Sequence, residues 1–177
     1  MKLWMKILML VAAFGILYVS FARAGLDEVT NDEKYDRLRK INISYQDERM
    51  GQLKCYRLPE SNTLPDSPFY FLKSFRDDLW IKFSRNLIDK TRIVALMADK
   101  KAYEAITLYD EGKTNLAKEI LVISKDKIDL SRELVNQITQ KTPEIDQLKR
   151  RILEAEDFHN YVEKEISLGN KILRCNE

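Results

Sequence analysis

From Pro68 to the end of the chain, apolar side chains recur every three or four residues with almost no break. This spacing places them on one face of successive α-helices. The whole chain contains only five glycines and four prolines, the residue types that interrupt helices most strongly. The pattern therefore predicts an all-α fold made of long helices.

The first of these helices is shorter than the others and rich in aromatic residues. Ser67 fits the N-cap position and Pro68 the first helical position, where its missing N–H costs nothing. We expect the apolar seam to face the core, although an exposed partner-binding stripe is a second interpretation of the same aromatic residues. The seam consists of Phe69, Leu72, Phe75, Leu79 and Phe83, and Phe71, Trp80 and Ile81 widen it.

Three long helices follow, over residues 86–111, from about residue 114 to the vicinity of Lys141, and from Pro143 almost to the C-terminus. Their links, near Gly112 and Lys141, are very short, and short links make consecutive helices antiparallel neighbours. The sequence thus predicts an elongated antiparallel bundle of three long helices plus the shorter aromatic helix. In the last helix, Gly169 falls in register with a seam of 3.5-residue period that predicts coiled-coil-like packing, and we expect a close approach of a neighbour there.

Cys55 and Cys175 are the two cysteines of the chain. The first helix either folds back against the second or extends it. If it folds back, Cys55 lies near the pole where the last helix ends, and the two sulfurs can meet. We expect this arrangement and a Cys55–Cys175 disulfide, with two unpaired thiols as the alternative.

Residues 1–24 have the features of a secretory signal peptide. Lys2 and Lys6 precede an apolar stretch, and small residues occupy the positions before a cut between Ala24 and Gly25. About 15 apolar residues are fewer than the ~20 that a spanning helix needs, but an uncleaved membrane anchor is an open alternative. The leader predicts an extracytoplasmic protein, in the periplasm, on the cell surface or secreted, that meets a membrane only through an uncleaved leader.

Residues 25–63 are polar and show little periodicity, so we expect a largely irregular arm before a helical bundle domain at 64–177. Without the leader, the chain has 27 basic and 28 acidic residues. A nucleic-acid-binding protein usually has a basic excess, and a polybasic membrane patch needs a run of like charges that is missing here. The charge pattern therefore excludes both classes.

The segment from Leu64 to Lys73 resembles the entry motif of an uncharacterised domain family, which reads Leu-Pro-x-Ser-Pro-x-Tyr-x-Leu-Lys. Its members are mostly exported or membrane-tethered prokaryotic proteins with long charged helices. The resemblance covers roughly residues 58–140 and implies an extracytoplasmic helical module without established chemistry. The motif residues here are Pro65, Ser67, Pro68, Tyr70 and Lys73.

Little in the sequence points to catalysis. His159, the only histidine, lies on the seam of the last helix, where it is either a general base or pH switch or a structural histidine bonded to a carboxylate or carbonyl. One histidine and two distant cysteines cannot form a structural zinc site, and no glycine-rich phosphate loop occurs. We expect no catalytic, cofactor-binding or metal-binding residues.

The sequence thus predicts an exported, non-enzymatic helical module that binds a partner or serves as a structural component of the cell envelope. The expected partner is another envelope protein or a second copy of the chain. The alternative function is an extracytoplasmic regulator or a chaperone-like protein that holds a partner polypeptide.

Overall fold

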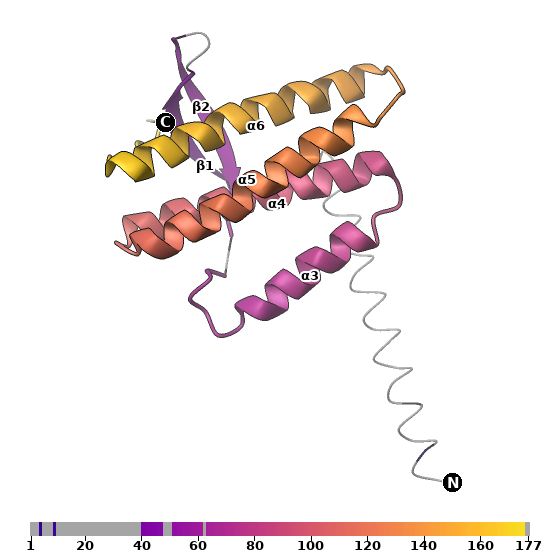
Figure 1. Cartoon of the computed structure of the whole chain (residues 1–177), viewed down its shortest axis with the longest axis horizontal. Helices are drawn as coiled ribbons and strands as arrows, with labels where there is room; N and C mark the ends of the chain where they lie inside the picture. Colours follow the sequence, from indigo (N-terminus) through magenta and orange to yellow (C-terminus); the bar gives the residue numbers. More distant parts are fainter. Residues whose placement is uncertain (1–3, 5–8, 10–39, 48–50, 62, 176–177) are drawn as a thin grey trace.

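The computed structural model describes residues 4, 9, 40–47, 51–61 and 63–175 (Figure 1). Apart from residues 4 and 9, the predicted leader lies outside the described residues, as do its cut between Ala24 and Gly25 and the first part of the predicted arm. In the part that the structure describes, no helix combines the length and apolarity needed to cross a bilayer. The elements are β1 (Lys40–Gln46), β2 (Leu53–Pro59), α3 (Tyr70–Lys82), α4 (Leu87–Asp110), α5 (Thr114–Asn136) and α6 (Pro143–Leu168).

Three long helices, α4, α5 and α6, run antiparallel to their chain neighbours and lie side by side, as the short links predict (Figure 1). The shorter helix α3 folds back along α4 at the edge of this group, so the folded-back arrangement is confirmed. Small side chains on α4 let α5 and α6 approach closely. Ala98, Ala102 and Ala105 are completely buried there.

Local signals for the helix ends explain the boundaries of α4 and α6. The Asn86 side chain accepts a hydrogen bond from the Asp89 amide at 2.8 Å, and the Thr142 hydroxyl accepts one from the Ile145 amide at 3.3 Å. Pro143 follows Thr142 as the first residue of α6. The cap-and-proline signature at Thr142–Pro143 is therefore confirmed.

The predicted start of α3 is wrong by two residues. The helix begins at Tyr70 and its N-cap is Phe69, without a side-chain cap. Ser67 instead forms a turn, because its carbonyl accepts from the Tyr70 amide at 3.0 Å and its hydroxyl from the Phe69 amide at 3.4 Å. Pro68 lies inside this turn rather than at the first helical position.

Gly169 has a different role from the predicted one. It adopts a left-handed conformation, with φ of 76°, and terminates α6 at Leu168. A side chain added at Gly169 would meet no atom within 4 Å, so no neighbour approaches closely there. The residue is a stop signal of the usual C-terminal type.

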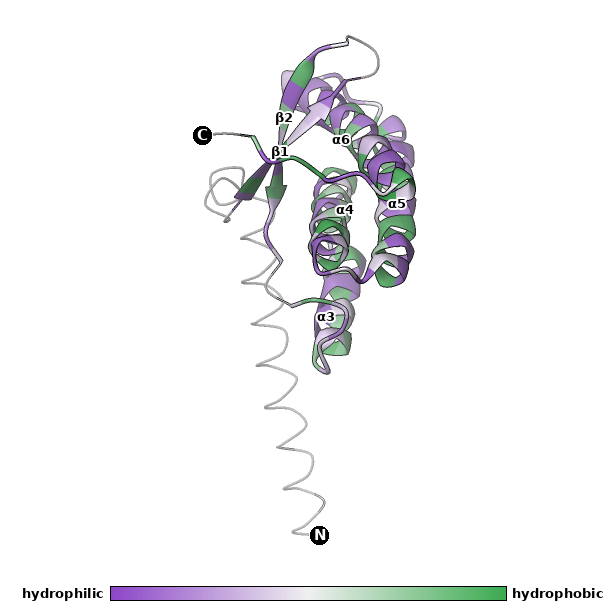
Figure 2. Cartoon of the chain, turned by 90° about the vertical axis from the view of Figure 1, so that its left-hand side faces the viewer, coloured by the Kyte–Doolittle hydropathy of each residue, from purple (hydrophilic) through white to green (hydrophobic). Residues whose placement is uncertain are grey.

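A β-hairpin corrects both the all-α prediction and the irregular arm predicted for residues 25–63. Strands β1 and β2 pair antiparallel, with Ile43 opposite Tyr56. The two strands lie against α4 and α6 on one side of the bundle (Figure 2). The Tyr56 ring stacks on Phe158 with centroids 4.3 Å apart, and Tyr45 meets Phe158 edge-on at 5.6 Å.

The sequence does contain a signal for this hairpin. Ile41, Ile43 and Tyr45 alternate with polar residues, which is the period of a half-buried strand. The 3-residue spacing of Tyr35, Leu38 and Ile41 instead suggests a short helix, and Ile41 belongs to β1. The strand pattern prevails because it places Ile43 and Tyr45 on one face, where both side chains are buried.

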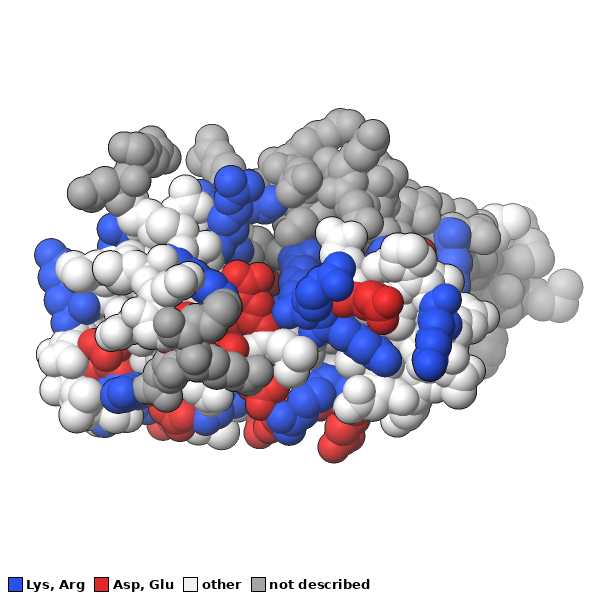
Figure 3. Space-filling view, turned by 90° about the horizontal axis from the view of Figure 1, so that it is seen from above, with Lys and Arg blue, Asp and Glu red and all other residues white. Residues whose placement is uncertain are grey.

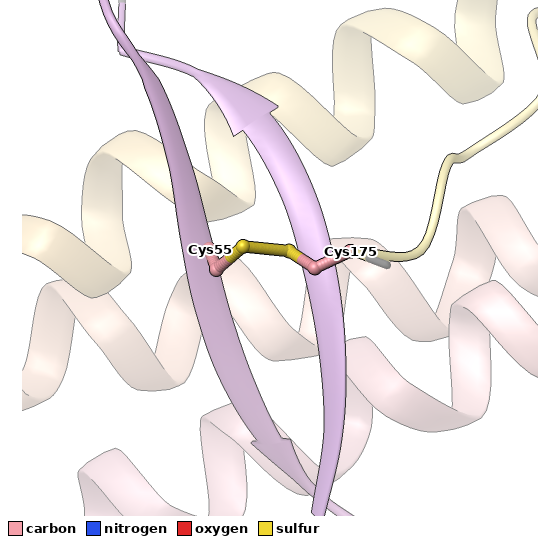
Figure 4. Close-up of a disulfide and its surroundings, with 2 residues drawn as sticks. All are labelled: Cys55 and Cys175. Carbon is pink, nitrogen blue, oxygen red and sulfur yellow. A yellow bond between two sulfur atoms is a disulfide. The ribbon is translucent and has the colours of Figure 1, made fainter. Parts of the chain in front are cut away.

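The C-terminal segment after α6 joins the hairpin and closes the fold. The Ser44 amide donates to the Leu173 carbonyl at 2.9 Å, and the Cys175 amide donates to the Asn42 carbonyl at 3.0 Å. Cys55 of β2 forms the predicted disulfide with Cys175, with Cα atoms 6.2 Å apart (Figure 4). The bond links positions that are 120 residues apart, and the four helices from α3 to α6 lie between these positions in the chain.

We predict that replacing both cysteines with serine lowers the free energy of unfolding by up to about 4–5 kcal/mol, because the bond restricts a long loop in the unfolded chain. Urea denaturation with and without a reducing agent measures this. The reducing agent should destabilise the wild type and leave the Cys55→Ser/Cys175→Ser variant unchanged. Equal stability of oxidised and reduced wild type would contradict the prediction.

A second prediction concerns Tyr45, whose hydroxyl is buried and has no hydrogen-bond partner. Burial, assisted by Glu154, Asp47 and Asp157, raises the pKa of Tyr45 to about 12. Above pH 10 the unfolded chain therefore loses this proton first, and stability falls as the pH rises towards 12.

The variant Tyr45→Phe should be as stable as the wild type at pH 7, or more stable by about 1 kcal/mol, because it removes an unsatisfied buried group. It should also lose about 1 kcal/mol less between pH 7 and pH 11. Urea denaturation at both pH values tests this, with Tyr103→Phe as the control. A parallel pH dependence of Tyr45→Phe and wild type would rule the interpretation out.

Candidate functional site

Helix α3 turns Tyr70, Lys73 and Asp77 to the protein and most of its large apolar side chains to solvent. Asp77 and Trp80 are buried against α4, whereas Phe71 is 66 % and Phe75 59 % exposed. At 100° per residue, Phe71, Leu72, Phe75 and Leu79 lie on one side of the helix, and this side points away from α4. The predicted inward orientation of the seam is wrong, and the second interpretation, an exposed aromatic stripe, describes the structure.

We call this exposed surface the α3 ridge. Its members are large apolar side chains that are each more than half exposed. They are Phe69, Phe71, Leu72, Phe75 and Phe83.

A fully buried carboxylate explains why the other side of α3 faces inward. Glu104 of α4 is 0 % exposed, and it accepts hydrogen bonds from Tyr70 at 2.8 Å and Ser61 at 2.9 Å. Lys73 of α3 and Lys101 of α4 both form ion pairs with it, the second at 3.2 Å. We call these five residues the Glu104 hub.

In and beside the hub, burial and nearby carboxylates have opposite effects on the pKa values of two lysines. Burial lowers the pKa of Lys101, and the nearby Glu104 carboxylate opposes that shift. Burial also lowers the pKa of the adjacent Lys100, with Asp77 opposing it. Because a buried charge is costly without its partner, the hub holds the N-terminal half of α3 in one orientation.

The C-terminal half of α3 is held by apolar contacts instead. Trp80 packs with Ile93 and Met97 of α4. Arg76 lies over the Trp80 ring, with its guanidinium carbon 4.6 Å from the ring centroid, and pairs with Asp77 at 2.7 Å. Ion pairs at one end and an apolar cluster at the other thus fix the rotation of α3 about its axis.

The structure gives most of the entry-motif residues a role. Tyr70 and Lys73 supply the α3 side of the hub, while Pro65, Ser67 and Pro68 lie in the turns before the helix. Asp66 pairs with Lys113 at the start of α5, at 2.5 Å, and this hydrogen bond lowers the pKa of Asp66. The motif residues therefore fix the position of the N-terminal end of α3.

A family model described as a domain of unknown function (DUF5667) matches residues 62–167. The chain belongs to this family. The DUF5667 domain contains the α3 ridge and all of the hub except Ser61, whereas the hairpin and both cysteines lie outside the matched residues. No curated protein and no solved structure matches the chain.

Near the C-terminal end of α3, the DUF5667 domain has a surface hollow of about 270 Å³. It is formed by the start of α4 and the residues that follow α5, at the pole where α3 leads into α4 (Figure 1). Its lining residues are the apolar Leu87, Ile88 and Ile138 and the polar Asn86, Gln137, Thr139 and Gln140. The hollow begins three residues after Phe83, the last residue of the ridge.

His159 lies in a buried polar cluster on the other side of α4. Its Nε2 is 3.4 Å from Asp99 Oδ1, too poorly aligned for a hydrogen bond, and its Nδ1 is 3.3 Å from Ser124 Oγ. Tyr56 donates to Asp99 at 3.0 Å. The carboxylate beside His159 thus comes from α4, not from the sequence neighbours Asp157 and Glu163.

The cluster contains a serine, a histidine and an aspartate, the residue types of a hydrolytic triad. In this fold, however, all three are buried, and the Ser124 hydroxyl donates to the Ala98 carbonyl at 2.7 Å. A catalytic serine must reach a substrate carbonyl, whereas the Ser124 hydroxyl is buried against the backbone of α4. His159 thus lies beside the Asp99 carboxylate without a hydrogen bond to it, and its Nδ1 contacts the Ser124 hydroxyl instead of the expected carboxylate or carbonyl.

Among the described residues, no group of His, Cys, Asp and Glu side chains could hold a metal ion. On the face seen from the α6 side, basic and acidic side chains alternate over the surface (Figure 3). This face therefore shows no field of a single sign. The α3 ridge remains the surface of the DUF5667 domain that most needs an explanation.

We predict that Glu104→Ala lowers the free energy of unfolding by about 3–5 kcal/mol, because it leaves buried lysines without their counter-charge. Lys73→Met should cost less, since Glu104 retains Lys101, Tyr70 and Ser61. Urea denaturation measures both, and amide exchange along α3 locates the change. If Glu104→Ala left stability and α3 exchange unchanged, the hub would not hold the helix.

Proposed function

We propose that this protein is an exported, non-enzymatic binding module of the cell envelope and that the α3 ridge is its docking surface. The partner is an apolar segment of another polypeptide. The observation that carries this proposal is the orientation of α3, whose phenylalanines face water while Lys73 and Asp77 face the protein.

The size of the ridge supports the proposal. Its four phenylalanines are each 55–66 % exposed, and with ring residues of about 150–250 Å² each the ridge presents roughly 500 Å² of apolar surface. The largest apolar patch on a monomeric protein is about 300–600 Å² and is often functional. A patch of this size on a single helix is typical of a surface that another molecule covers.

The location and the origin of the module are part of the same proposal. Residues 1–24 direct the chain out of a prokaryotic cell, and the sequence from Leu64 to Lys73 is the entry motif of its family. In this proposal the motif serves binding, because Tyr70 and Lys73 draw the polar side of α3 inward. The hairpin and the disulfide strengthen the module for work outside the cytoplasm.

A chaperone-like protein that holds unfolded polypeptides is the second candidate. The proximity of the apolar-walled hollow to Phe83 favours it, since an unfolded chain could use the ridge and the hollow together. Suppression of aggregation separates the two functions. A holdase protects many unrelated unfolded proteins, whereas a specific docking module protects none of them.

We predict that Phe71→Asp/Phe75→Asp reduces the fluorescence of a bound hydrophobic dye several-fold, because it divides the patch that the dye recognises. The matched control is Val122→Asp/Ile123→Asp, which changes two exposed apolar residues of α5 and should leave dye binding nearly unchanged. Circular dichroism verifies that both variants fold.

In the native envelope, a photoreactive residue at position 75 should crosslink to one defined polypeptide, and the same residue at position 122 should not. Substituting Phe71 with Asp should abolish the crosslink from position 75. Equal dye binding by both double variants, together with equal crosslinking from both positions, would refute the proposed docking surface.

A further inference from the structure

We infer that the α3 ridge binds the α3 ridge of a second copy of this chain, antiparallel and about a twofold axis. This inference rests on the proposed function, because it names the partner of the same surface. It is carried by the shape of the ridge, its area and the charges at its two ends.

The shape of the ridge suits another helix. It lies along a helix of 13 residues, which is about 20 Å long at 1.5 Å per residue. The outer face of a single helix is convex, and convex helix faces pack on each other by fitting the side-chain rows of one between those of the other. A second copy supplies such a face with the same length and the same apolar residues, as a twofold contact requires.

The area is sufficient for a weak, reversible dimer. Each copy contributes roughly 500 Å², so two ridges bury about 1,000 Å² in total, the lower limit for a specific interface. The long seam of α6 cannot supply an alternative contact, because Ile145, Ile152 and Val162 are buried within the monomer. Self-association through α3 leaves the bundle intact.

Charges at the ends of α3 favour the antiparallel orientation. At the entry end, Asp66 and Glu111 both pair with Lys113, which leaves these three residues with a net negative charge. At the other end, Lys82 is exposed in the last turn of α3. Antiparallel packing places Lys82 of each copy beside the acidic entry end of the other, whereas parallel packing would place like charges together.

An anionic membrane surface fits the ridge less well than a second copy. Membrane-surface helices combine an apolar side with many flanking lysines and arginines. Around the ridge, the exposed cations Lys82 and Arg85 are accompanied by the exposed acids Asp66 and Asp78. The electrostatic attraction to anionic lipid is therefore weak, and binding of the chain to anionic vesicles in place of dimerisation would overturn the inference.

Thiol crosslinking tests the geometry directly. Both native cysteines are in the disulfide, so one introduced cysteine is the only free thiol of the chain. A short bis-maleimide should join Phe75→Cys to itself, because this residue is near the middle of the ridge and hence near the twofold axis. Phe69→Cys and Phe83→Cys should each remain uncrosslinked alone and join one another when mixed. Crosslinking of Phe69→Cys to itself would indicate a parallel pair and overturn the antiparallel one.

Sedimentation across a dilution series measures the association. The wild-type chain should shift from monomer to dimer with concentration, Phe71→Asp should weaken the dimer at least tenfold, and Val122→Asp should leave it unchanged. A wild type that is monomeric throughout, yet binds the dye and crosslinks to another envelope protein through position 75, would overturn this inference and leave the proposed function standing. A monomer whose ridge variants change neither dye binding nor crosslinking would overturn both.

Discussion

The buried carboxylate of Glu104 accepts hydrogen bonds from Ser61 and Tyr70 and forms ion pairs with Lys73 and Lys101. A carboxylate without these partners would be very costly at zero exposure, so α3 must present Tyr70 and Lys73 to α4. Because helix faces lie opposite one another, fixing Tyr70 and Lys73 inward fixes Phe71 and Phe75 outward. The exposure of the aromatic side chains is thus a consequence of the polar interaction beneath them.

The rest of the fold provides a firm base for that interaction. On the far side of α4, the hairpin contributes Tyr45 and Tyr56 to an aromatic group around Phe158. The disulfide then links β2 to the end of the chain. Segments from outside the DUF5667 domain therefore complete the core on one side of α4, while α3 covers the other side. Glu104 is held between the two, on a helix that cannot easily shift.

The sequence predicts the helices well because their signals are local. Thr142 and Pro143 indicate a helix start without any contribution from distant residues. The 3.6-residue period of apolar residues indicates the buried face of α4, α5 and α6. The disulfide could also be inferred, from the folded-back helix and the position of Cys175. Two features could not, because they depend on partners distant in sequence. Ile41, Ile43 and Tyr45 alternate with polar residues in β1, a strand of only seven residues. This alternation indicates a buried face only because β1 packs against α6. The orientation of α3 depends on Glu104, which lies 31 residues after Lys73.

The α3 seam shows why periodicity alone cannot assign a buried face. A 3-4 repeat establishes that apolar residues share one side of a helix, and burial of that side follows only if nothing favours the opposite side more strongly. In α3, Lys73 and Tyr70 bind the buried Glu104 carboxylate, whose charge Lys73 and Lys101 balance. Turning the polar side of α3 outward would take Lys73 and Tyr70 away from Glu104 and leave a buried charge with fewer partners. It would also remove Trp80 from its cluster with Ile93 and Met97. The monomer therefore folds without using the ridge. Phe71 and Phe75 stay exposed in the monomer, and this exposure is the basis of the docking surface that we propose.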